Sequence, residues 1–245
     1  MWTVIGLVLM VVGFISVLVC AKLQKTNPNA QPLAIASAAV MLTGLGIYGY
    51  FYMFGSNDGD METAMIYQCS IMDQAGNYLK KAAPGKKVVF VVEPGLSKTE
   101  NGKKLLEAQQ KAFEKAYGGS VEVVEFEVEG LNEEDGGSYA DTMKVADFEK
   151  LVAENESADI FVLTIGLPSG DQIPDFKGKT VFLTNNGMIE TKDLKSAIEE
   201  GTITAVVTGN GKKIDPNFEP DEDKLKEAFD TRWIIVDKSN LDKLK

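Results

Sequence analysis

The polar residues best suited to bind a ligand fall in four short loops, each of which follows an apolar run. The six residues we single out are Glu93, Ser169, Asp171, Asn185, Asn186 and Asn210. Amides and hydroxyls both donate and accept hydrogen bonds, and carboxylates attract cationic or hydroxylated groups. Such a set could hold a small polar ligand. Asn and Gly are also ordinary residues of tight turns, so the same loops are compatible with a purely structural role.

Residues for catalysis and for cofactors are scarce. The chain has no histidine and two cysteines, Cys20 and Cys69, which excludes Ser–His and Cys–His nucleophile pairs and leaves no metal-ligand spacing. The run GNGKK at 209–213 lacks the first glycine of a P-loop, and no GxGxxG follows the first apolar run. We therefore predict no metal, no cofactor and no enzymatic activity. Carboxylates such as Glu93 and Asp171 leave acid–base chemistry as the remaining catalytic alternative.

Charge is unevenly distributed along the chain. Lys22 and Lys25 are the only charged residues before Asp58. The whole chain has a net charge of −11, so without these two lysines the rest carries −13. So acidic a segment repels the phosphate backbone of nucleic acids, and we exclude DNA and RNA as partners.

Apolar runs that alternate with helical patterns position the four loops. The expected strands are residues 87–93, 121–128, 159–165, 180–184, 203–208 and 233–237, and the expected helices are residues 101–117, 144–155, 191–200 and 221–230. Strands this apolar, separated by helices, are typical of a parallel sheet that is covered on both faces. The predicted fold class is α/β, with a doubly wound, mostly parallel, Rossmann-like sheet of five to six strands. Ligands of such sheets bind beyond the carboxyl ends of the strands, where these loops lie.

Two apolar segments at the N-terminus predict a transmembrane helical hairpin over residues 1–56. Residues 2–21 contain no charge. Twenty helical residues span about 30 Å, the thickness of the hydrocarbon core of a bilayer. Residues 33–55 form the second predicted helix and end in aromatic residues that suit the headgroup region. The first segment lacks the basic start of a signal peptide, so we expect an integral, multi-pass protein of the cell membrane.

The link between the two apolar segments predicts the orientation of the rest of the chain. Lys22 and Lys25 favour the cytoplasmic side, which places both termini and the soluble domain on the extracytoplasmic side. Residues 57–85 are expected to form an amphipathic connecting helix, since apolar residues recur there at helical spacing. Residues 86–245 are expected to form the soluble α/β domain.

Five apolar runs and the loops that follow them resemble those of a known fold family. They read VVFVVEPG, VEVVEFEVEG, ADIFVLTIGLPSG, KTVFLTNNG and ITAVVTGNG, between about Lys86 and Asp237. Their order resembles one lobe of a type I periplasmic binding protein, which implies a fold that binds small solutes. Those proteins clamp a ligand between two lobes, and this chain has room for one. The whole chain also resembles bacterial membrane-anchored proteins with such a domain, which implies no particular function.

Two functions follow from these patterns. The first is a membrane-anchored, extracytoplasmic binding or sensing module, with a small polar ligand at the carboxyl edge of the sheet. The alternative is a structural subunit that docks on another protein of the membrane or envelope and has no ligand of its own. The first predicts a concave pocket at that edge, whereas the second predicts a flat apolar patch.

Overall fold

The structure is a computed structural model that describes residues 2–23, 30–53, 58–128, 142–168, 173–185, 189–213, 215 and 217–244. It contains two compact units, Met1–Met61 and Glu62–Lys245. Three candidate site residues, Ser169, Asp171 and Asn186, lie outside the described residues.

The first unit is a pair of helices, α1 (Trp2–Leu23) and α2 (Ala30–Met53). They approach closely at Gly13, where an added Cβ would lie 2.7 Å from the main-chain nitrogen of Met41. Large apolar side chains on both helices are exposed, among them Phe14 at 54% and Ile35 at 66%. Over the residues that the structure describes, no helix is long and apolar enough to count as a membrane span, so the two predicted spans are not confirmed.

The second unit is built on a six-stranded sheet in the order β2-β1-β3-β4-β5-β6. The strands are β1 (Val88–Val92), β2 (Val121–Glu125), β3 (Ile160–Leu163), β4 (Thr180–Leu183), β5 (Ala205–Gly209) and β6 (Trp233–Asp237). The first five are parallel, and β6 runs antiparallel to β5. The chain winds outward from β1 to β2 and then back through β3, β4 and β5, so the predicted mostly parallel α/β sheet is confirmed.

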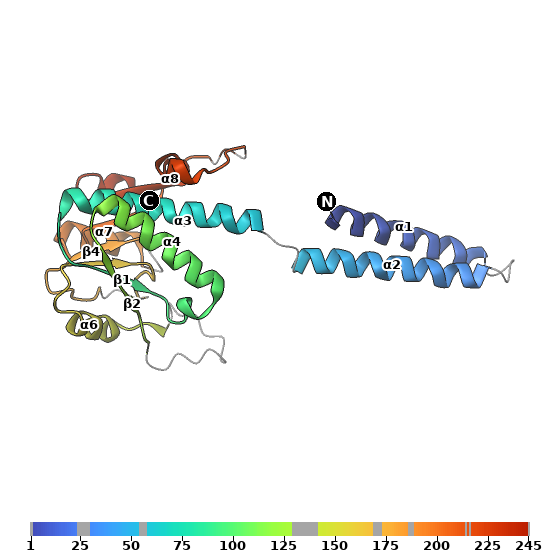
Figure 1. Cartoon of the computed structure of the whole chain (residues 1–245), viewed down its shortest axis with the longest axis horizontal. Helices are drawn as coiled ribbons and strands as arrows, with labels where there is room; N and C mark the ends of the chain where they lie inside the picture. Colours follow the sequence, from blue (N-terminus) through green and yellow to red (C-terminus); the bar gives the residue numbers. More distant parts are fainter. Residues whose placement is uncertain are drawn as a thin grey trace. The chain divides into compact units, whose positions relative to one another are not determined.

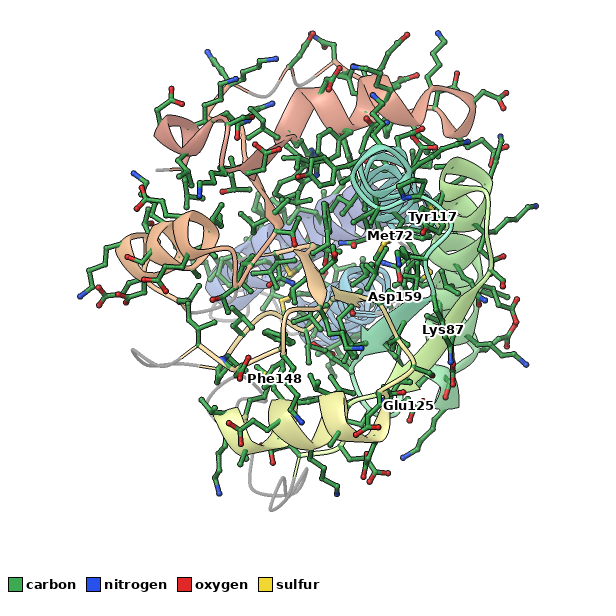
Figure 2. The ribbon with its side chains drawn as sticks, turned by 90° about the vertical axis from the view of Figure 1, so that its left-hand side faces the viewer. Met72, Lys87, Tyr117, Glu125, Phe148 and Asp159 are labelled. Atoms are coloured by element: carbon green, nitrogen blue, oxygen red, sulfur yellow. The ribbon has the colours of Figure 1, made fainter. Side chains whose placement is uncertain are left out.

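Helices cover both faces of the sheet (Figure 1). On one face lie α3 (Asp58–Ala82), α4 (Glu100–Tyr117) and α8 (Leu225–Arg232), and on the other lie α6 (Val145–Glu154) and α7 (Thr191–Glu200). The alternating side chains of β1 serve the two layers, since Val89 and Val91 pack with α6 and α7 whereas Phe90 packs with α3 and α4. Figure 2 shows Met72 of α3 and Phe148 of α6 on opposite sides of the sheet.

The predicted connecting helix forms and packs on the sheet. In α3, Met72, Ala75 and Leu79 are fully buried and belong to the core that includes Phe90. An added Cβ at Gly76 would lie 2.8 Å from the carbonyl oxygen of Phe113, so α3 and α4 cross with their main chains close together. Burial of this apolar face explains why α3 from Glu62 onward belongs to the same compact unit as the sheet.

Two predicted elements have different bounds in the structure. The helix predicted over 221–230 is divided into a 3₁₀ turn, η3 (Glu222–Lys224), and α8, because the Asp221 carboxylate accepts a hydrogen bond from Asp223 N–H (2.9 Å) and closes a short turn first. The β1–α4 connection contains a 3₁₀ turn, η1 (Leu96–Lys98), and a further one, η4 (Leu241–Lys243), follows β6. The strand predicted over 121–128 ends at Glu125.

Candidate functional site

The carboxyl ends of the parallel strands share one edge of the sheet, and three of the predicted site residues lie there. Glu93 directly follows β1, Asn185 lies two residues beyond β4, and Asn210 directly follows β5. Glu93 and Asn185 are exposed, and Asn210 is half-buried. Their placement at this edge agrees with the predicted topology, but their role in binding stays a prediction.

Two threonines fasten the strand ends at this edge, and the predicted site did not include them. The hydroxyl of Thr164 donates to the carbonyl of Val91 (3.0 Å), and the hydroxyl of Thr184 donates to the carbonyl of Leu163 (3.2 Å). These bonds tie β1 to β3 and β3 to β4 where the winding of the chain reverses. Their only signal in the sequence is a threonine directly after an apolar run.

The two described asparagines also bond to the main chain. Asn185 Nδ2 donates to the carbonyl of Thr164 (2.9 Å), which continues the chain of bonds across the strand ends. Asn210 Nδ2 donates to the carbonyl of Asp230 (2.9 Å), and its Oδ1 accepts from Lys212 N–H (2.8 Å). Both amides therefore brace loops, as asparagines in turns commonly do.

Glu125, at the end of β2, is a carboxylate of this edge that accepts two hydrogen bonds, and sequence reasoning missed it. It accepts hydrogen bonds from the hydroxyl of Ser97 and from Gly95 N–H (3.3 Å). The bond from Ser97 is the main reason that the pKa of Glu125 lies below its usual value, with Gly95 N–H lowering it further. Figure 2 labels Glu125 at the margin of the domain, between α6 and α4. No sequence signal links it to a loop 28 residues away.

The loop that holds Glu125 closes tightly onto the start of α4. Thr99 is the N-cap residue, and its hydroxyl accepts from Gly102 N–H (3.0 Å). An added Cβ at Gly102 would lie 2.0 Å from the carbonyl oxygen of Leu96, so a glycine is required where the η1 turn meets the helix. The loop thereby holds the Ser97 hydroxyl against the Glu125 carboxylate of β2, an arrangement that can bind hydroxylated or cationic groups.

Two cavities bordered by described residues of the domain lie away from Glu93, Asn185 and Asn210, although Glu125 lines one of them. One of about 380 Å³ is bordered by Asp175, Asp193 and Glu200, and one of about 290 Å³ lies between the end of β2 and α6. Glu93, Asn185 and Asn210 line neither of them. In the part of the chain that the structure describes, no group of three or more His, Cys, Asp or Glu side chains is arranged to hold a metal ion.

Comparison with known proteins gives distant structural similarities only. Neither protein-family models nor curated proteins match the chain. Among solved structures, it is similar to the substrate-binding protein of a sugar ABC transport system from Bordetella parapertussis, with 15% identity and a TM-score of 0.39 over 72% of this chain and 57% of that one. It is also similar to a carbohydrate transporter from Acidothermus cellulolyticus, in complex with myo-inositol, with 16% identity and a TM-score of 0.39 over 71% of this chain and 58% of that one. The sugar-binding protein of a sugar ABC transporter from Bacillus halodurans has 12% identity to the chain and a TM-score of 0.41, over 73% of this chain and 64% of that one.

These three structures are described as those of a substrate-binding protein, a carbohydrate transporter and a sugar-binding protein. The chain spans less than two thirds of the length of each of them. With TM-scores near 0.4, no conclusion about ligand or mechanism follows from them.

Proposed function

We propose that the chain is a membrane-anchored binding module. The α1–α2 hairpin would be inserted in the cell membrane and would hold the acidic α/β domain on the extracytoplasmic side. The domain would bind a small polar ligand at the carboxyl edge of its sheet. The observation that carries the proposal is the exposed apolar surface of the hairpin.

That surface favours removal of the hairpin from water. The large apolar side chains exposed on the two helices include Leu7, Val11, Phe14, Ile15, Leu18, Leu33, Ile35, Leu42 and Leu45. Apolar area in contact with water costs roughly 25 cal/mol per Å², and soluble proteins rarely leave a large contiguous patch exposed. Each helix satisfies its own main-chain hydrogen bonds, as a segment in a bilayer must. A bilayer is therefore the environment that suits these two helices.

Vesicle flotation tests the anchoring. The full chain would be reconstituted with phosphatidylcholine vesicles, washed at alkaline pH and floated on a density gradient. We expect the protein to float with the lipid. A variant with Val11→Lys and Leu18→Lys, which places two charges on α1, should float less, whereas Lys103→Glu and Lys111→Glu on exposed positions of α4 should change nothing. Recovery of the wild-type protein in the aqueous fraction would refute the anchoring.

The carboxyl edge offers a ligand polar side chains whose strand ends are braced by hydrogen bonds. Thr164, Thr184 and Asn185 fix the ends of β1, β3 and β4 relative to one another, so Glu93 and Asn185 are presented from a rigid base. Ser169, Asp171, Asn186 and Asn210 complete the proposed set. Isothermal titration with a panel of neutral and cationic hydroxylated solutes tests the site. Asn185→Ala and Asn210→Ala should abolish any binding found, and Asn217→Ala, on an exposed loop, should not.

The alternative is a structural subunit without a ligand of its own. The observation that favours it is that the described amides of this edge bond to main-chain carbonyls, while neither of the two cavities bordered by described residues is lined by Asn185 or Asn210. Under this alternative, no solute of the panel binds, and a partner protein purifies with the chain whether or not Asn185 and Asn210 are replaced.

A further inference from the structure

The edge strand β2 has main-chain groups that face away from the sheet. Among the described strands it pairs only with β1, in a register that sets Val121 opposite Val88 and Glu125 opposite Val92. Phe126 N–H donates to the carbonyl of Val92 (2.9 Å). Because the main-chain groups of successive strand residues point to opposite sides, even-numbered residues of β2 face β1 and odd-numbered residues face outward.

Side chains of helix α4 form hydrogen bonds with the main chain of only the first of these outward residues, Val121. Val121 N–H donates to Glu114 Oε1 (3.0 Å), and the carbonyl of Val121 accepts from Gln110 Nε2 (3.5 Å). Within the described ranges, the outward main-chain groups of Val123 and Glu125 take part in no such bond. An unpaired stretch of edge strand is a template for another extended chain.

An acidic groove of about 290 Å³ runs beside this open edge, between the end of β2 and α6. Its lining includes the apolar residues Val124 and Leu151. The charged residues that line it are Glu125, Glu127, Asp147, Glu154 and Lys150. Four carboxylates against one lysine make the groove strongly negative, and Glu127 and Glu154 are exposed.

We propose that this edge binds an extended basic segment of a partner protein, which adds to β2 as a further strand. Main-chain hydrogen bonds to Val123 and Glu125 would set its register. Alternate side chains of an added strand point to the same face, so basic residues at every second position would meet the carboxylates of the groove. A second copy of this chain is a poor occupant, because it would bring an identical acidic groove against the first.

A labelled peptide tests the proposal independently of any solute at the carboxyl edge. The probe is a fluorescein-labelled peptide of four Lys-Val repeats, and its counterpart has four Glu-Val repeats. Fluorescence anisotropy would be measured with the full chain in nonionic detergent micelles at low salt. We expect saturable binding of the lysine peptide alone. Val123→Pro removes an outward N–H without touching the ladder to β1, and it should weaken binding roughly tenfold.

Two charge-matched double variants distinguish binding at the groove from nonspecific attraction to the acidic domain. Glu127→Lys with Glu154→Lys should weaken binding about tenfold or more, whereas Glu107→Lys with Glu227→Lys, on exposed positions of α4 and α8, should change it less than about twofold. Equal losses of affinity for the two pairs would overturn the proposal.

If Val123→Pro alters the circular dichroism spectrum, the wild-type chain is tested with a peptide N-methylated at alternate residues. Binding of that peptide as tight as that of the parent would contradict strand addition.

Discussion

Tyr78 of α3 donates a hydrogen bond of 3.1 Å to Asp237 Oδ2 at the end of β6, across 159 positions of the sequence. The Tyr78 ring also lies against Phe182 of β4, with 5.7 Å between ring centroids. Asp237 in turn accepts from Ser239 N–H (2.8 Å) and from the Ser239 hydroxyl (2.6 Å). These contacts fasten α3 to the sheet near its antiparallel edge, in addition to the apolar packing of the helix.

Loss of the Tyr78 hydroxyl should destabilise the domain in a pH-dependent way. Burial raises the pKa of the Tyr78 phenol above its usual value, and the charge of Asp237 and the hydrogen bond to it raise this pKa further. Above the unfolded-state pKa of about 10, the phenol ionises in the unfolded chain but stays protonated in the folded chain. Its contribution to stability is therefore full below that pKa and is lost as the pH rises above it. Tyr78→Phe should therefore lower the free energy of unfolding by about 1 kcal/mol at neutral pH.

Urea unfolding of the wild type and of Tyr78→Phe, at neutral pH and above about pH 10, measures this effect. The difference between the two chains should shrink in the alkaline series. A difference that stays constant across this range would show that the hydroxyl contributes nothing through its protonation state.

A methyl group at Gly76 should loosen the contact between α3 and α4. Its Cβ would lie 2.8 Å from the carbonyl oxygen of Phe113 and 2.9 Å from the Cβ of Ala116. Overpacking of this kind costs about 1–3 kcal/mol. That cost exceeds the gain of about 1 kcal/mol that alanine has over glycine in a helix. We expect Gly76→Ala to lower the unfolding midpoint in urea.

Gly209→Ala is the control for this variant, because no atom lies within 4 Å of the added Cβ. The control should change stability by less than about 0.5 kcal/mol. A Gly76→Ala chain as stable as the control would mean that α3 and α4 can separate at no cost.

The two hydroxyls of the β1–α4 loop should have separable roles. Thr99→Ala removes the N-cap bond to Gly102 N–H and should cost about 1 kcal/mol of stability. Ser97→Ala leaves that cap intact but removes the main cause of the lowered pKa of Glu125. The pKa of Glu125 should then rise toward its usual value, as measured by NMR titration of its carboxyl carbon. A shift of this pKa in Thr99→Ala, but not in Ser97→Ala, would contradict the assignment.

The sheet could be predicted because its strands are buried on both faces. Runs such as Val88–Val92 and Ile160–Leu163 are wholly apolar and lie between turn residues, so their periodicity and length identify them. The helix over 221–230 was predicted less well, because the turn at Asp221 depends on one side-chain bond to Asp223 N–H. Such local competition leaves no periodic signal.

The candidate site could be predicted only at the level of the edge on which it lies. Topology alone brings the ends of β1, β4 and β5 together, so Glu93, Asn185 and Asn210 were placed correctly at one edge. The bond from Asn185 to the carbonyl of Thr164 depends on the spacing of two strand ends, and the bond from Ser97 to Glu125 depends on the path of a loop. Neither distance is encoded in a local pattern of residues.

The side of the membrane on which the domain lies is the most direct test of the proposed function. Cys69 is a poor reporter, because it is half-buried and burial raises the pKa of its thiol, which the charge of Glu222 raises further. A cysteine at the exposed position of Lys111, in a Cys69→Ser chain, avoids this problem. Intact cells would be treated with a membrane-impermeant maleimide, and detergent-opened cells would show that the thiol can react. Labelling in intact cells is the predicted result, whereas labelling only after the cells are opened would contradict an extracytoplasmic binding module.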